Sequence, residues 1–96
     1  DTTADVAGLF TQLAVEYFAA TRAGEGAVST GERPSALFAR FDEALPARGR
    51  PIADVVARLD AEVIADANRL MHPMYMGHQV SAPLPAAVWA DVVVSA

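Results

Sequence analysis

The chain has 96 residues, of which 53% are hydrophobic and 20% charged, and its formal net charge is −5. A polypeptide of this length forms one domain at most, and this apolar content is too high for intrinsic disorder. The acidic balance and the scattered arginines exclude the usual nucleic-acid-binding surface, and no apolar run reaches the roughly 18 residues of a membrane span. We therefore expect neither nucleic-acid nor membrane partners.

Four helices and no strand are predicted, so the expected fold class is all-α. The first helix covers about residues 3–23, because its apolar residues recur at steps of three and four. These residues are Val6, Leu9, Phe10, Leu13, Tyr17 and Ala20. Thr2 and Asp5 have the spacing of a capping box, and the glycines that follow predict a linker over about residues 24–34.

The second helix is expected from Ser35 to about Ala44, after Pro34 and before Pro46. The third is expected from Pro51 to about Leu70 and carries one apolar stripe and one charged side. The stripe consists of Ile52, Val55, Val56, Leu59, Val63, Ala67 and Leu70. Four-residue steps on the charged side predict two ion pairs of Arg58, with Asp54 and with Glu62.

The last segment, residues 86–96, has Asp91 as its only charge. Prolines just before it and a run of alanines favour a helix, although three consecutive valines also suit a strand. So apolar a helix should be buried on almost all sides. It ends without a capping glycine or a basic last turn, which indicates a cut through an element and a continuing polypeptide.

The segment between the third and fourth helices is His72-Pro73-Met74-Tyr75-Met76-Gly77-His78-Gln79-Val80-Ser81. Taken with the Leu45-Pro46-Ala47-Arg48-Gly49-Arg50-Pro51 turn, the amphipathic helix and the Pro83-Leu84-Pro85 turn, it resembles the N-terminal region of the group II pyridoxal-phosphate decarboxylases. That family includes glutamate, aromatic amino acid, cysteine sulfinate and diaminobutyrate decarboxylases. The resemblance covers roughly the second half of the chain.

The resemblance implies a fold type I enzyme that is an obligate dimer. The absence of cysteine suits a cytoplasmic protein, so we expect the cytoplasm as its location. Residues 1–71 would be an N-terminal helical segment that wraps the partner subunit. Residues 72–81 would be a loop at the active site. Residues 82–96 would start an apolar helix that leads into a large cofactor domain outside this chain.

The resemblance also implies substrate-binding positions at Tyr75, His78 and Gln79. His78 matches a position that contacts the substrate side chain in the family, and an imidazole there favours a small polar or acidic amino acid. Met76 departs from the aromatic residue that is commoner at its position. The reaction would release carbon dioxide from the α-carbon of an amino acid, with pyridoxal phosphate as the electron sink.

The cofactor itself would be bound by residues outside this segment. All seven basic residues are arginine, and the imine that holds pyridoxal phosphate needs a lysine. We therefore expect the segment alone to be inactive, with no catalytic, cofactor-binding or metal-binding residue of its own. Two histidines six residues apart, without an acidic residue between them, match no known metal-site spacing.

Structural interpretations of the same residues remain open. His72 is expected to be a turn or helix-ending residue, and the methionines of the loop could simply pack in an interface. The alternative function is a small all-helical interaction or dimerisation module without catalytic activity. That module would need nothing beyond the amphipathic helices.

Overall fold

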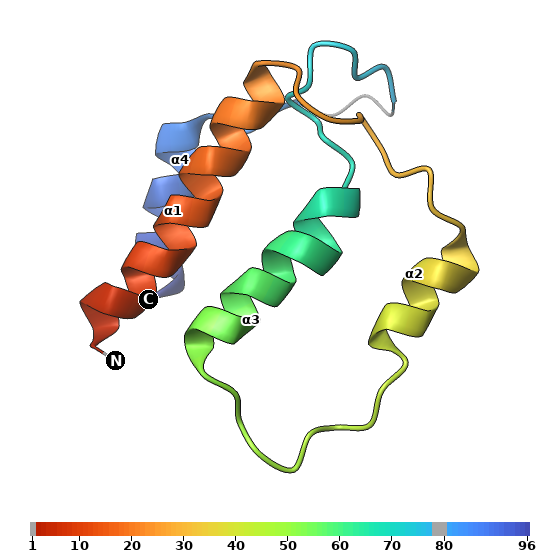
Figure 1. Ribbon diagram of the computed structural model, residues 1–96. Coiled ribbons are helices and arrows are strands. Elements are labelled where there is room, and N and C mark those ends of the chain that lie inside the picture. The colour runs from red at the N-terminus through yellow and green to blue at the C-terminus, as the bar shows by residue number, and fades with distance from the viewer. Residues whose placement is uncertain (1, 78–80) are drawn as a thin grey trace.

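Figure 1 shows the computed structural model, which describes residues 2–77 and 81–96. These residues are helical, without strands, in the order α1 (Thr3–Arg22), α2 (Pro34–Phe41), α3 (Ile52–Arg58) and α4 (Pro85–Ser95). α3 continues into a π-helical turn, Leu59–Val63, and then a 3-10 turn, Ile64–Asp66. The expected all-α class with about four helices is confirmed for this part of the chain.

The first helix begins at the capping box that the sequence predicts. The Thr2 hydroxyl oxygen accepts a hydrogen bond from the backbone N–H of Asp5 at 3.1 Å, and the Asp5 carboxylate accepts one from the backbone N–H of Thr2 at 3.0 Å. The bond from the Thr2 backbone is the main cause of the lowered pKa of Asp5. α1 ends beside Gly24, whose φ of +75° directs the chain away from the helix axis.

The hydrophobic interior is thin. α1 and α3 pack side by side (Figure 1), and Val56 of α3 is the one buried hydrophobic residue among those described. The Cα atoms span 41 × 35 × 21 Å, so the molecule is flat. Several apolar residues of these two helices stay exposed among the described residues, including Phe10 of α1 and Val55 of α3.

The second helix is shorter than predicted. It ends at Phe41 instead of about Ala44, and the backbone leaves the helical region at Asp42, where ψ is 75°. Beyond this point the carboxylate of Glu43 accepts a hydrogen bond from Arg58 of α3, with 2.6 Å between Nη1 and Oε1. This ion pair joins the segment after α2 to α3 and links residues fifteen apart in the chain, so helical periodicity gives no sign of it.

The third helix also ends earlier than predicted, at Asp66 instead of about Leu70. The carboxylate of Asp66 accepts hydrogen bonds from the hydroxyl of Thr30 and from the guanidinium of Arg40. Arg40 also donates to the backbone oxygen of Glu62 at 3.3 Å. These side chains hold the end of the helix, and at Ala67 the backbone is extended with ψ of 152°.

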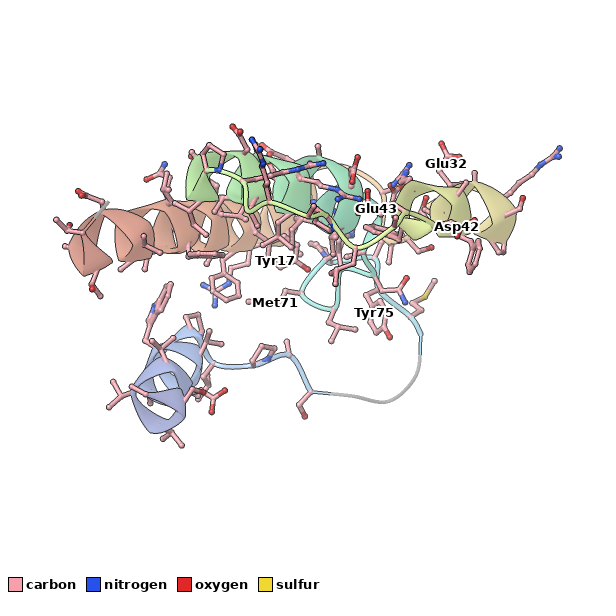
Figure 2. The ribbon with its side chains drawn as sticks, turned by 90° about the horizontal axis from the view of Figure 1, so that it is seen from below. Tyr17, Glu32, Asp42, Glu43, Met71 and Tyr75 are labelled. Atoms are coloured by element: carbon pink, nitrogen blue, oxygen red, sulfur yellow. The ribbon has the colours of Figure 1, made fainter. Side chains whose placement is uncertain are left out.

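α4 is helical as predicted, but its expected burial is not found. Val93 is 75% exposed and Val94 is 81% exposed, and no residue of the helix is buried. Figure 2 shows α4 on one side of the layer formed by α1 and α3. The described part of the chain therefore lies on one side of α4 only, and the other side stays exposed.

None of the helices in the described residues has both the length and the apolar character that a membrane crossing needs.

Candidate functional site

The candidate site is the loop that follows the 3-10 turn, residues 67–77, which contains the first half of the predicted active-site loop. Two successive turns shape it. The backbone N–H of His72 donates to the carbonyl oxygen of Arg69 at 3.0 Å, and that of Tyr75 donates to the carbonyl oxygen of His72 at 2.9 Å. The loop is thus a defined turn with His72 at its centre.

His72 is the anchor of this turn. The residue is only 8% exposed, and its Nδ1 accepts a hydrogen bond from the backbone N–H of Met74 at 3.0 Å. An Nδ1 that accepts carries no proton, so a neutral imidazole in this position has its proton on Nε2. The expectation that His72 is a turn residue is confirmed, and its burial adds a role that the sequence does not reveal.

The loop is fastened to the end of α1 through the predicted linker. The backbone N–H of Arg69 donates to the carbonyl oxygen of Val28 at 2.8 Å. Gly24 lies against the ring of Pro73, since a Cβ atom on Gly24 would be 3.8 Å from Cδ and Cγ of that proline. In Figure 1 the end of α1 and this loop meet at the same end of the molecule. Residues 24–28 therefore form the platform on which the loop rests.

Tyr75 is the one predicted substrate-binding residue that the structure describes. It is half-buried, and its ring lies over Gly77, where an added Cβ would come within 2.6 Å of the tyrosine hydroxyl oxygen. Tyr75, Met71 and Tyr17 lie on the side of the helical layer where α4 is found (Figure 2). The predicted substrate-binding residues His78 and Gln79 lie outside the described residues.

Two of the three methionines of the loop are exposed. Met74 is exposed, and Met76 is 87% exposed. Flexible thioether side chains adapt to the shape of what they contact, which suits the wall of a pocket or an interface. The loop therefore combines a fixed centre at His72 with exposed apolar side chains on either side of Tyr75.

Three buried polar atoms at this end of the molecule have no hydrogen-bond partner among the described residues. They are Oγ1 of Thr21, Nε of Arg69 and Nε2 of His72. Buried polar atoms in folded proteins almost always have a partner. Their grouping at the base of the loop marks this region as incompletely satisfied within the described chain.

A network of ion pairs supports the loop from the other side. Asp66, directly before the loop, has a pKa below its usual range, chiefly because of the hydrogen bond from the Thr30 hydroxyl and then because of Arg40. The bond to Asp66 likewise raises the pKa of Arg40. Thr30 and Asp66 are 36 residues apart in the chain, so this network is a contact that sequence reasoning missed.

The second pair of the network confirms part of the sequence prediction. Arg58 pairs with Glu62 as expected, and its other partner is Glu43 instead of Asp54. Its guanidinium carbon also lies 5.7 Å from the centre of the Phe41 ring. Hydrogen bonds to both glutamates raise the pKa of Arg58.

Within residues 2–77 and 81–96, no group of three or more His, Asp or Glu side chains is arranged to hold a metal ion. The chain has no lysine, so it does not fit covalent attachment of pyridoxal phosphate. No protein-family model, curated protein or solved structure matches the chain.

Proposed function

We propose that this chain is the N-terminal portion of a pyridoxal-phosphate-dependent amino acid decarboxylase. Its helices would form contacts between two subunits, and its loop would form one wall of the substrate pocket. The cofactor and its lysine would come from polypeptide outside this segment. The sequence resemblance over residues 45–96 is the origin of the proposal.

The observation that carries the proposal is the construction of the loop around His72. The imidazole is buried and bonded to the backbone, while Met74 and Met76 on the far side of the turn are exposed. A loop that only joins two helices needs no buried histidine at its centre. A pocket wall does need a fixed backbone, because residues that contact a substrate act through their position.

The exposed apolar surface supports the proposed subunit contacts. Val92, Val93 and Val94 form an exposed apolar end of α4, and only one hydrophobic residue of the described chain is buried. Apolar surface of this kind on a small helical segment is typical of a face that packs against another chain or another domain. We therefore propose a homodimer, with an amino acid as the small-molecule partner.

The substrate class rests on His78. We propose that this imidazole, next to Gly77, donates to a polar or acidic side chain of the substrate, and that Tyr75 and Gln79 complete that wall. In the complete enzyme, His78→Ala should impair use of the substrate and leave the visible absorbance of the bound cofactor in place. A lost cofactor spectrum, or unchanged kinetics with every amino acid, would remove His78 from the pocket.

The second candidate function is an all-helical interaction module without catalysis. The thin interior and the exposed valines of α4 favour it, because a module of this kind needs apolar faces and no chemistry. The complete reading frame separates the two candidates. A continuation with a lysine-bearing strand-and-helix region favours the decarboxylase, and a stop codon after Ala96 favours the module.

A further inference from the structure

A second place in the molecule has the composition of a ligand site. A cavity of about 170 Å³ lies between α1 and the π-helical and 3-10 turns that follow α3. Three charged side chains line it, namely Glu16, Asp60 and Arg69. Cavities that hold drug-sized ligands usually measure about 300–1,000 Å³, so this one suits a smaller molecule.

Arg69 is held in place at one end of this cavity. Its guanidinium carbon is 5.9 Å from the centre of the Tyr17 ring, an arrangement in which the cation faces the aromatic ring. On another side lies Gly26, where an added Cβ would be 3.4 Å from that same carbon. The φ of +72° at Gly26 brings the backbone this close. Arg69 is therefore a positioned group and not a free surface side chain.

Arg69 forms no ion pair among the described residues, although Glu16 and Asp60 line the same cavity. The three ion pairs found among the described residues involve Arg40 and Arg58 only, and Nε of Arg69 is buried without a hydrogen-bond partner. The planar fork of a guanidinium matches a carboxylate, which can bind it through two parallel hydrogen bonds. The cavity beside Arg69 is where a small carboxylate would satisfy it.

Two carboxylates at the cavity favour a positively charged group of a ligand. Glu16 comes from α1 and Asp60 from the π-helical turn, and neither forms an ion pair among the described residues. Glu16 accepts one hydrogen bond from the amide of Gln12, which leaves further acceptor positions on its carboxylate. Two negative groups at one small cavity favour an ammonium group between them.

The remaining wall is apolar. It is formed by the hydrocarbon side chains of Leu13, Ala20 and Ile64. A ligand that satisfies the whole cavity therefore has one carboxylate, one ammonium group and a short hydrocarbon part. A free α-amino acid with an apolar side chain has this composition.

We propose that this cavity binds such an amino acid. Arg69 holds its carboxylate, and Glu16 with Asp60 holds its ammonium group. The apolar side chain lies against Leu13 and Ile64. Arg69 belongs to the loop of residues 67–77, but Tyr75 does not line this cavity. The proposal holds whether the chain belongs to a decarboxylase or to an interaction module.

Titration of the intact chain with three probes tests the proposal, with calorimetry and the Arg69 Nε–H signal in NMR as readouts. L-Leucine carries both charged groups, 4-methylpentanoate lacks the amine, and 3-methylbutylamine lacks the carboxylate. We expect leucine to bind about tenfold or more tightly than either analogue, because each analogue loses a charge-assisted hydrogen bond. No cofactor is needed, so the result is independent of the proposed decarboxylase.

Substitutions test which residue binds the carboxylate of the ligand and which binds its ammonium group. Arg69→Gln should abolish the advantage of leucine over 3-methylbutylamine, and Glu16→Gln should reduce its advantage over 4-methylpentanoate. Arg33→Gln, at an exposed arginine outside the cavity, is the matched control and should change nothing. Glu16 is exposed, so its variant keeps the test valid if Arg69→Gln fails to fold.

Three results would overturn the proposal. The first is the absence of any heat or shift with millimolar leucine. The second is equal binding of leucine and its two analogues. The third is unchanged leucine binding in folded Arg69→Gln and Glu16→Gln.

Discussion

The imidazole Nδ1 of His72 and the backbone N–H of Met74 form a 3.0 Å hydrogen bond across Pro73. The intervening residue has no N–H of its own, so it offers no competing donor. In many turns the side-chain oxygen of an asparagine or aspartate accepts a hydrogen bond from the backbone N–H two residues further along the chain. The imidazole of His72 accepts the equivalent hydrogen bond here. This relationship fixes the backbone that carries Tyr75.

The first prediction separates the acceptor of His72 from its volume. His72→Phe keeps a buried ring and loses the acceptor, whereas His72→Asn is smaller and supplies an oxygen in a suitable position. We expect exchange of the Met74 amide hydrogen to become about fivefold faster in His72→Phe, since a hydrogen bond of about 1 kcal/mol is lost. His72→Asn should restore part of the protection. Equal protection in His72→Phe and the unmodified chain would show that the bond does not hold the loop.

The second prediction concerns Gly24, which has a φ of +75° and lies against Pro73. Gly24→Ala should lower the free energy of unfolding by about 1–2 kcal/mol, because an L-residue is strained in this conformation. Gly31→Ala is the matched control, since a Cβ there meets no atom within 4 Å and the residue has no positive φ. Urea denaturation measures both. Equal effects of the two substitutions would contradict the proposed platform.

The third prediction is the pH dependence of the Asp66 network. The pKa of Asp66 lies below that of an unfolded aspartate, about 3.9, mainly because of Thr30 and then Arg40. The network therefore stabilises the fold fully above that value, and the contribution disappears as pH falls through the lowered pKa. Asp66→Asn should remove this part of the acid-induced loss of stability, measured by urea denaturation from about pH 6 to pH 2.

A matched control strengthens that measurement. Asp91→Asn changes an exposed carboxyl group of α4 that forms no ion pair among the described residues. We expect its acid unfolding curve to follow that of the unmodified chain. If Asp66→Asn and the unmodified chain lose stability in parallel, the Thr30 and Arg40 contacts do not act through the charge of Asp66.

The elements that periodicity and capping residues predict are the ones whose contacts are local. The capping box joins Thr2 and Asp5, three residues apart, and α1 follows it nearly as expected. The ends of α2 and of the third helix are different, because they depend on Glu43 and Asp66, whose partners are distant in the chain. A single sequence carries no sign of those partners, so both helices were predicted too long.

The candidate site also has features that the sequence predicts and features that depend on distant contacts. Its place after the third helix and the turn at His72 follow from the order of helix, proline and glycine. The burial of His72 and the support from Gly24 and Val28 do not, because they depend on how α1 meets the loop. Arg69 belongs to the charged side of the predicted third helix, and only the early end of that helix brings it beside Tyr17.

The fourth prediction tests the exposed end of α4. Val93→Ser together with Val94→Ser should change the free energy of unfolding of the isolated chain by less than about 0.5 kcal/mol, because both side chains are mostly exposed there. In the complete protein the same pair should weaken subunit association, measured by sedimentation at several concentrations. Unchanged association in the complete protein would place the subunit contact elsewhere.

We propose that these residues belong to an amino acid decarboxylase whose cofactor is held by another part of the polypeptide. The most direct test measures carbon dioxide released from a panel of amino acids by the product of the complete reading frame, with and without pyridoxal phosphate. We expect release that depends on the cofactor, is greatest with a small polar or acidic amino acid, and falls in His78→Ala. Absence of cofactor-dependent release with every amino acid would contradict it.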